Sequence, residues 1–139
     1  MTPKKEILLV DADGLKLSLN RYRFRIYDYR VHSASTEGQA IALVRRYPDI
    51  LVAVIDINGM EYDYLVGEFR TINPYMRTVL TSEFTRASEL EHYADCFLGR
   101  EYAGSPGILK NWVRSMAVRK RGPKTVEPAH VPLEIQIGA

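Results

Sequence analysis

The stretch that decides the fold is Ile50-Leu51-Val52-Ala53-Val54-Ile55-Asp56. Its six apolar residues follow one another without a polar interruption, and the run ends at a carboxylate. Unbroken hydrophobicity over so short a length is typical of a strand that is covered on both faces, as in a parallel sheet. The stretch therefore predicts a central strand whose sheet carries helices on both sides.

Shorter apolar runs and helical patterns alternate along the rest of the chain. Strands are expected at residues 7–10, 30–34, 78–80 and 96–98, with helical spacing of apolar residues between consecutive strands and after the last one. Thr36 with Gln39 and Ser88 with Glu91 form capping boxes that begin two of these helices. Trp112, on the apolar side of the last helix, is expected in the core. Because every connection is long enough for a crossover helix, the order predicts an α/β fold with a doubly wound, five-stranded parallel sheet.

The composition is that of one ordinary soluble domain. The chain has 139 residues, of which 46% are hydrophobic and 26% are charged, and these values exclude a disordered or fibrous protein. The single cysteine, Cys96, excludes an internal disulfide framework and is expected as a small buried apolar residue. No apolar run is long enough for a membrane helix, so a cytoplasmic location is expected.

Residues 1–122 form the expected domain, and residues 123–139 differ from it in character. Pro123, Pro128 and Pro132 break up the first part of this tail, whereas residues 133–137 alternate between apolar and polar. The tail is either a disordered linker or an edge strand that pairs with this sheet or with a second copy of the chain.

The net charge of +2 conceals blocks of like charge. Basic residues crowd two segments (Lys16, Arg21, Arg23, Arg25 and Arg30; Lys110, Arg114, Arg119, Lys120, Arg121 and Lys124), and acids lie between them (Glu83, Glu89, Glu91, Asp95 and Glu101). Such blocks are either solvated helix faces or a contact surface for a partner. Because no element that reads bases is present, the basic blocks predict no specific nucleic-acid binding.

Polar side chains follow several of the expected strands, at the end where ligands bind in doubly wound sheets. They are Asp11 and Asp13 after the first strand, Asp56 after the third, Thr81 and Ser82 after the fourth, and Arg100 after the fifth. Carboxylates and hydroxyls at one edge suit a hard divalent ion such as Mg²⁺ and a phosphoryl group, and a carboxylate in that place can attack phosphorus. The alternative is that the aspartates only cap the helices that follow them.

Four short motifs, taken together, resemble the receiver domain of bacterial response regulators over residues 5–120. They are Val10-Asp11-Ala12-Asp13, Val54-Ile55-Asp56-Ile57-Asn58, Leu80-Thr81-Ser82 and Phe97-Leu98-Gly99-Arg100. The resemblance implies a flavodoxin-like sheet with strand order 2-1-3-4-5. It also implies a role in two-component signalling.

The resemblance further implies roles for individual residues. Asp56 matches the aspartate that accepts a phosphoryl group from a histidine kinase. Asp11 and Asp13 match the acids that hold Mg²⁺, and Asn58 matches the residue that lends its backbone carbonyl to the ion. Thr81 matches the hydroxyl that contacts the phosphoryl group, and Phe97 matches the aromatic residue that reports the switch.

The sequence also departs from the receiver pattern around this site. Ala12 replaces the second of two adjacent acids, Arg100 replaces a lysine at the end of the last strand, and Glu101 replaces a proline that is usually cis. The loop at residues 58–62 lacks the usual Met-Pro insertion, and the stretch from residue 81 to residue 100 is about three residues short. These departures predict weakened binding of Mg²⁺ and leave open whether phosphorylation is retained.

Two functions of different classes follow from these residues. The first is a signalling module that is phosphorylated on Asp56 by a sensor histidine kinase, or that binds another signalling protein without phosphorylation. The alternative is an Mg²⁺-dependent phosphatase or phosphotransferase with Asp56 as its nucleophile. Asn58 stands where such enzymes carry a general acid, so we expect no enzyme.

A self-complementary face near the end of the chain suits a two-fold homodimer. It combines the acids Glu89, Glu91 and Asp95 with the bases Lys110 and Arg114, from the expected helix at residues 88–93, the last strand and the last helix. In active receivers this face mediates dimer or effector contacts. The sequence thus predicts a second copy as one possible partner.

Overall fold

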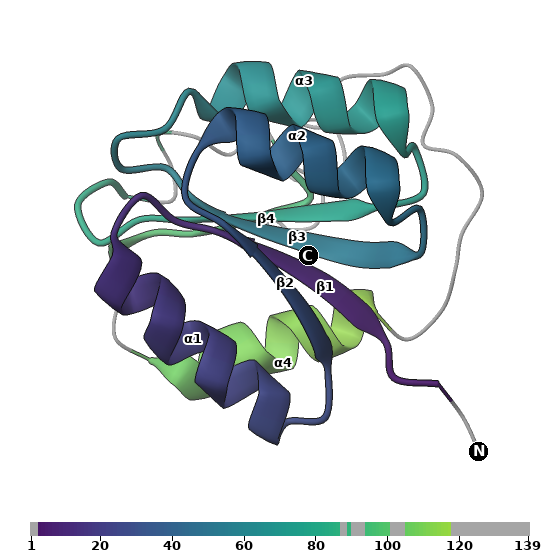
Figure 1. Ribbon diagram of the computed structural model, residues 1–139. Helices are drawn as coiled ribbons and strands as arrows, with labels where there is room; N and C mark the ends of the chain where they lie inside the picture. Colours follow the sequence, from purple (N-terminus) through teal and green to yellow (C-terminus); the bar gives the residue numbers. More distant parts are fainter. Residues whose placement is uncertain (1–2, 87–88, 90–93, 101–104, 118–139) are drawn as a thin grey trace.

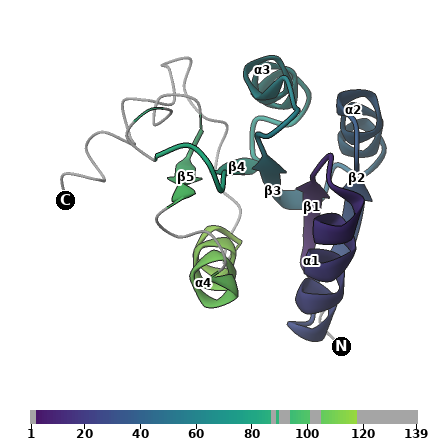
Figure 2. The same cartoon turned by 90° about the vertical axis from the view of Figure 1, so that its left-hand side faces the viewer.

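The computed structural model describes residues 3–86, 89, 94–100 and 105–117. Within them a five-stranded parallel sheet lies between two layers of helices, as Figures 1 and 2 show. The strands are β1 (Glu6–Val10), β2 (Arg30–Ala34), β3 (Ile50–Asp56), β4 (Arg77–Thr81) and β5 (Cys96–Leu98); the helices are α1 (Gly14–Ile26), α2 (Glu37–Arg46), α3 (Tyr62–Ile72) and α4 (Pro106–Met116). The sheet order is β2-β1-β3-β4-β5, and this confirms the predicted flavodoxin-like fold.

The two faces of β3 explain why its apolar run has no polar interruption. Ala53 and Ile55 belong to the core beneath α2 and α3, whereas Val52 and Val54 belong to the core on the side of α1 and α4. Successive side chains of a strand point to opposite faces, so a strand with helices on both sides needs an apolar residue at every position. The result is a sheet whose central strand is fixed from both sides.

The start of α2 confirms the predicted capping box in a slightly shifted form. The Oγ1 atom of Thr36 accepts a hydrogen bond from the backbone N–H of Gln39, at 3.2 Å. The side chain of Gln39 in turn accepts from the backbone N–H of Ser35, one residue earlier than the usual pattern. The second predicted capping box, Ser88 with Glu91, lies outside the described residues, as do Glu101 and the tail at 123–139 with its expected strand.

Two predictions from the sequence are wrong. Trp112 is 42% exposed instead of lying in the core, because the apolar side of α4 is wider than its contact with the sheet and only Val113 is buried there. Asp95 is buried instead of contributing to an acidic surface. It lies just before β5, where the chain runs beneath the surface.

Cys96 lies in the core, as predicted. It is the first residue of β5 and is 5% exposed. Burial raises the pKa of its thiol to about 12. Among the described residues, none of the helices combines the length and the apolar character that crossing a membrane requires.

Candidate functional site

The carboxyl ends of β1, β3 and β4 meet at one edge of the sheet. Val10 is paired with Ile55 in the register of β1 and β3, and Asp56 is paired with Thr81 in the register of β3 and β4. Asp11, which follows β1 directly, therefore lies beside the end of β3. Both aspartates are buried, so the parallel register alone brings two carboxylates into one shielded place.

The carboxylate of Asp56 is held by one contact from each of three segments. Its Oδ1 atom accepts from the backbone N–H of Asn58 at 3.0 Å. Its Oδ2 atom accepts from the Lys16 Nζ at 2.9 Å and from the Thr81 Oγ1 at 3.4 Å. The structure thus brings Asp56, Asn58 and Thr81 together as the sequence implied, and adds a lysine to them.

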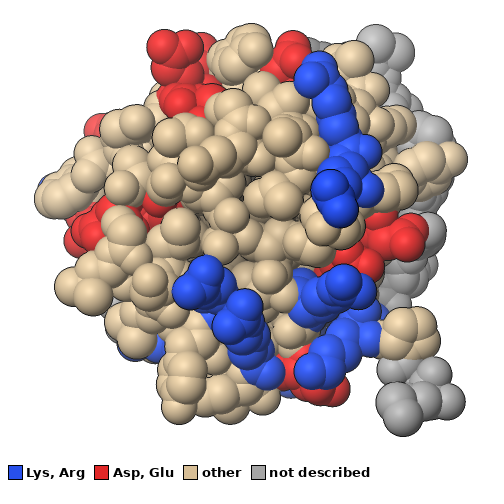
Figure 3. All heavy atoms as spheres, in the orientation of Figure 1, with Lys and Arg blue, Asp and Glu red and all other residues tan. Residues whose placement is uncertain are grey.

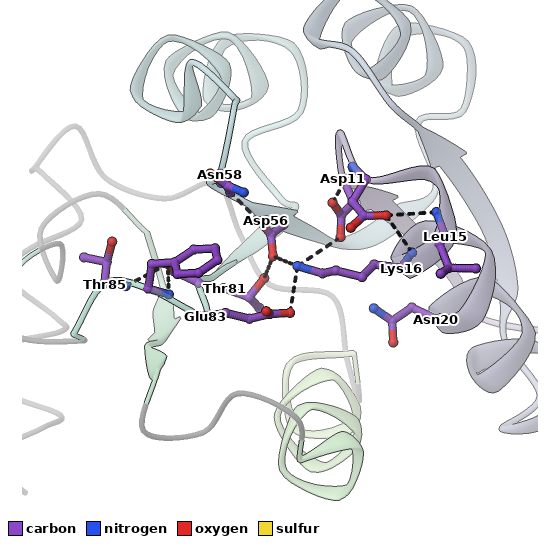
Figure 4. A network of polar contacts seen from close by, with 12 residues as sticks. Asp11, Leu15, Lys16, Asn20, Asp56, Asn58, Thr81, Glu83 and Thr85 are labelled. Atoms are coloured by element: carbon purple, nitrogen blue, oxygen red, sulfur yellow. Dashed lines mark hydrogen bonds and ion pairs between the residues drawn. The ribbon is translucent and has the colours of Figure 1, made fainter.

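Lys16 lies at the centre of the polar network in Figure 4. In addition to Asp56, its Nζ atom is 3.0 Å from Glu83 Oε2 and 3.9 Å from Asp11 Oδ2. Burial disfavours the charge of Lys16, but the hydrogen bonds to Asp56 and Glu83 outweigh this and raise its pKa above the ordinary value. The ammonium group is therefore fully charged and balances part of the negative charge of the three carboxylates.

The surroundings of Asp11 raise the pKa of its carboxyl group. Burial raises the pKa of its carboxyl, and the negative charge of Asp56 raises it further. The backbone N–H of Asp13, which donates to Asp11 Oδ1 at 2.9 Å, and the charge of Lys16 act in the opposite direction. The Asp11 carboxyl consequently depends on a backbone donor and on the Lys16 cation to remain ionised beside Asp56.

Asp13 lies at the N-cap of α1. Its Oδ1 atom accepts from the backbone N–H groups of Leu15 and Lys16, at 3.0 and 3.2 Å. This is the capping role that the sequence left open beside a metal-binding role. The cap also fixes the first turn of α1, from which Lys16 extends.

The residues expected toward β5 are not among the described hydrogen-bond partners of Asp56. Arg100 is exposed, and its backbone N–H donates to the carbonyl of Thr85 at 2.9 Å; its side chain is not among the described contacts of Asp56. Phe97 is buried in the core. The Ser82 hydroxyl accepts from the backbone N–H groups of Phe84 and Thr85, and so shapes the loop after β4.

A pocket of about 270 Å³ opens beside Asp56, between α1 and the start of α4. Its polar walls are Lys16, Asn20, Arg23, Asp56, Thr81, Ser82, Glu83 and Ser105, and its apolar walls are Leu19, Leu98, Pro106 and Leu109. Small-molecule sites are usually somewhat larger than this. The pocket suits a phosphoryl group or a single side chain.

The residues at this edge do not fit a divalent metal ion. Ala12 has no ligand atom, Asp13 is used as a helix cap, and the Lys16 ammonium lies between the carboxylates of Asp11 and Asp56. Within the described part of the chain, no group of three or more His, Cys, Asp or Glu side chains is placed to hold a metal ion. With Lys16 between Asp11 and Asp56, the described residues do not form the Mg²⁺ site expected from the sequence.

Sequence reasoning missed Lys16 and Glu83. It assigned both to blocks of surface charge, although each follows a strand that ends at the site. One signal was available for Lys16: it occupies the first turn of the helix after a strand that ends in an acid. Because side chains in a helix tilt toward its N-terminus, a long cation in that turn reaches back over the edge of the sheet.

Comparison with known proteins supports the fold. No protein-family model and no curated protein matches the chain. Among solved structures, a CheY-like response regulator receiver domain protein from Methanospirillum hungatei is 22% identical, with a TM-score of 0.70 over 81% of this chain and 92% of that one. A response regulator from Thermotoga maritima is 15% identical, with a TM-score of 0.70 over 84% and 99%.

A response regulator receiver domain protein from Clostridium thermocellum gives a similar result, with 15% identity and a TM-score of 0.70 over 81% of this chain and 93% of that one. At such low identities the likeness shows the fold alone. The chain accordingly has the fold of response-regulator receiver domains.

Proposed function

We propose that this chain is a receiver-type signalling domain that accepts a phosphoryl group on Asp56 and transmits the change by binding a partner protein. The observation that carries the proposal is the buried carboxylate of Asp56, at the end of the central strand, with the Thr81 hydroxyl on the neighbouring strand. A fold shared with receiver domains supports the same function.

In the proposed reaction, an Oδ atom of Asp56 attacks the phosphorus of a phosphohistidine. The new O–P bond forms as the N–P bond breaks, and the leaving imidazole nitrogen keeps the electron pair and takes up a proton. Lys16 and Thr81 both donate to Oδ2 in the resting site. The same two donors are within reach of the oxygens of a phosphoryl group on that atom.

The surface around the pocket supports a protein as the donor. Large apolar side chains of α1 are exposed, namely Leu15, Leu19, Tyr22 and Ile26, and Leu19 also lines the pocket. Large apolar side chains that are exposed together on one helix are typical of contact sites between proteins. In Figure 3, basic side chains lie among uncharged surface over the region where Figure 1 shows α1. A sensor histidine kinase is the partner that the reaction implies.

The homodimer predicted from the sequence stays part of this proposal on a reduced surface. Because Asp95 is buried, the acidic side of the dimer face rests on the remaining acids of that stretch. Sedimentation velocity, with and without a phosphoryl mimic, tests it. A monomer at high concentration in both conditions would remove the dimer from the proposal.

Amide NMR with beryllofluoride, a mimic of the acyl phosphate, tests the proposed function. We expect shifts around Asp56, Thr81 and Phe97, and none in the Asp56→Ala variant, which lacks the acceptor. The experiment is run with and without Mg²⁺, so that a requirement for the ion does not hide the response. An unchanged spectrum in both conditions would overturn the role of Asp56 as acceptor.

A further inference from the structure

The ammonium group of Lys16 is shared by carboxylates from three separate segments (Figure 4). Its distances to Asp56 Oδ2, Glu83 Oε2 and Asp11 Oδ2 are 2.9, 3.0 and 3.9 Å. Lys16 itself is largely shielded, with a side-chain exposure of 29%. A lysine on a solvated helix face, as the sequence suggested, would not gather three anions around it.

Two buried carboxylates at one place require a cation. Asp11 and Asp56 are both buried, and the negative charge of Asp56 disfavours the ionised form of Asp11. The cation must come either from solution or from the chain. A lysine held by the first turn of α1 is permanently present, so it loses no translational freedom when it enters the site.

An ammonium group and a divalent ion cannot occupy this place together. Lysine presents three N–H donors and accepts none; Lys16 donates to Asp56 and Glu83, and Asp11 lies within ion-pair distance. Mg²⁺ demands oxygen ligands at about 2.0–2.1 Å in octahedral geometry. With Lys16 Nζ at 2.9 Å from Asp56 Oδ2, an ion bound to that oxygen would meet a like charge at close range.

We propose that Lys16 is a built-in cation that takes the place of a divalent metal ion at the end of the sheet. Asp11 and Asp56 consequently bind Mg²⁺ weakly as long as Lys16 is present. The inference rests on the proposed function only in treating this edge as the working site. Its test requires no phosphoryl transfer.

Titration with Mn²⁺, a paramagnetic stand-in for Mg²⁺, tests the proposal through the broadening of amide signals. Lys16→Met keeps the length of the side chain and removes its charge, and leaves three carboxylates without their cation. We expect this variant to bind Mn²⁺ at least about tenfold more tightly than the unaltered protein, with broadening centred on Asp11, Asp56 and Asn58. Competition with Mg²⁺ then gives the affinity for that ion.

Two matched variants separate the local effect from a general change in charge. Arg23→Met removes one positive charge from the wall of the same pocket, but Arg23 contacts Asn20 rather than these carboxylates, so the affinity should change less than about threefold. Lys16→Arg keeps a cation in place and should bind Mn²⁺ as weakly as the unaltered protein. Equal affinity of Lys16→Met and the unaltered protein would overturn the proposal.

A second measurement needs no variant. The ¹⁵N-ammonium signal of a held lysine is resolved from those of lysines that exchange freely with water, and the signal of Lys16 should stay in place as Mg²⁺ is added. Its displacement at low Mg²⁺ would overturn the proposal. A gain of metal binding in Lys16→Met without any response to beryllofluoride would support the built-in cation and overturn only the proposed acceptor role of Asp56.

Discussion

Asp56 and Asp95 are buried to the same degree, each 6% exposed, but Asp56 is the last residue of β3, whereas Asp95 comes directly before the start of β5, at the opposite end of the parallel strands. Each accepts from a backbone N–H and from a threonine hydroxyl: Asn58 and Thr81 provide these donors for Asp56, and Thr78 provides both of them for Asp95. Asp95 thereby ties the start of β5 to β4. Asp56 has in addition a lysine partner on a flexible side chain, and it lines a pocket.

The difference between these two aspartates shows that burial does not by itself mark a functional acid. A carboxylate that joins the start of one strand to the backbone N–H and hydroxyl of the neighbouring strand holds the fold together. A carboxylate that is paired with a cation beside an opening is placed to meet a ligand from solution. The predictions below test this distinction.

The largest effect is expected at Asp95. Asp95→Ala leaves the buried N–H and hydroxyl of Thr78 without their acceptor, and should lower the free energy of unfolding by about 2–3 kcal/mol. Asp56→Ala should change it by less than about 1 kcal/mol, because Lys16 keeps Glu83 as a partner and Asp11 loses a like charge. Urea unfolding measures both values. Similar costs for the two variants would contradict the distinction.

A smaller effect is expected for the pair of Lys16 and Asp56. In a double-mutant cycle of Lys16→Met and Asp56→Ala, the interaction energy should be about 1 kcal/mol, since the lysine is partly open to solvent. The free energies of unfolding of the four proteins give this value. If the two single effects simply add, the contact seen in the structure makes no energetic contribution and the central place of Lys16 is lost.

The smallest effect is expected at Arg100, the cation that the sequence placed at the site. Arg100→Met should change the free energy of unfolding by less than about 0.5 kcal/mol and leave the affinity for Mn²⁺ unaltered, because this side chain is exposed. The measurements are those used for Lys16→Met, which serves as the positive control. A gain of metal binding equal to that of Lys16→Met would place Arg100 in the site as well.

The sheet could be predicted because a strand that is buried on both faces requires an uninterrupted run of apolar residues in the sequence. An apolar run such as Ile50–Ile55 is required wherever both faces of a strand are covered, and this holds whatever the distant contacts are. The position of Asp56 follows in the same way, because a polar residue that ends such a run lies at the end of the strand, where the sheet stops. Thr81 was found by the same argument on β4.

The partners of Asp56 could not be predicted with the same ease, because they depend on where side chains from distant segments converge. Lys16 and Asp56 are 40 positions apart, and its place in the first turn of the helix after β1 is the one local signal that separates Lys16 from the other bases of its segment. Asp95 was misassigned for the related reason that a charge pattern does not reveal which residues are enclosed. For Trp112, the helical period gave the apolar side of α4 but not how much of that side the sheet covers.

Because Cys96 is buried at the start of β5, its reactivity measures how often this strand opens to solvent. The chain has one cysteine, and its thiolate, the form that reacts with alkylating reagents, is almost absent near neutral pH because the folded pKa of about 12 lies above the ordinary value of 9.0. Above about pH 9 the unfolded chain loses this proton more readily than the folded one, so the thiol's contribution to stability is lost as the pH rises toward 12. At neutral pH, the rate of alkylation reports how often the edge beside β4 opens, at a single position and without any introduced label.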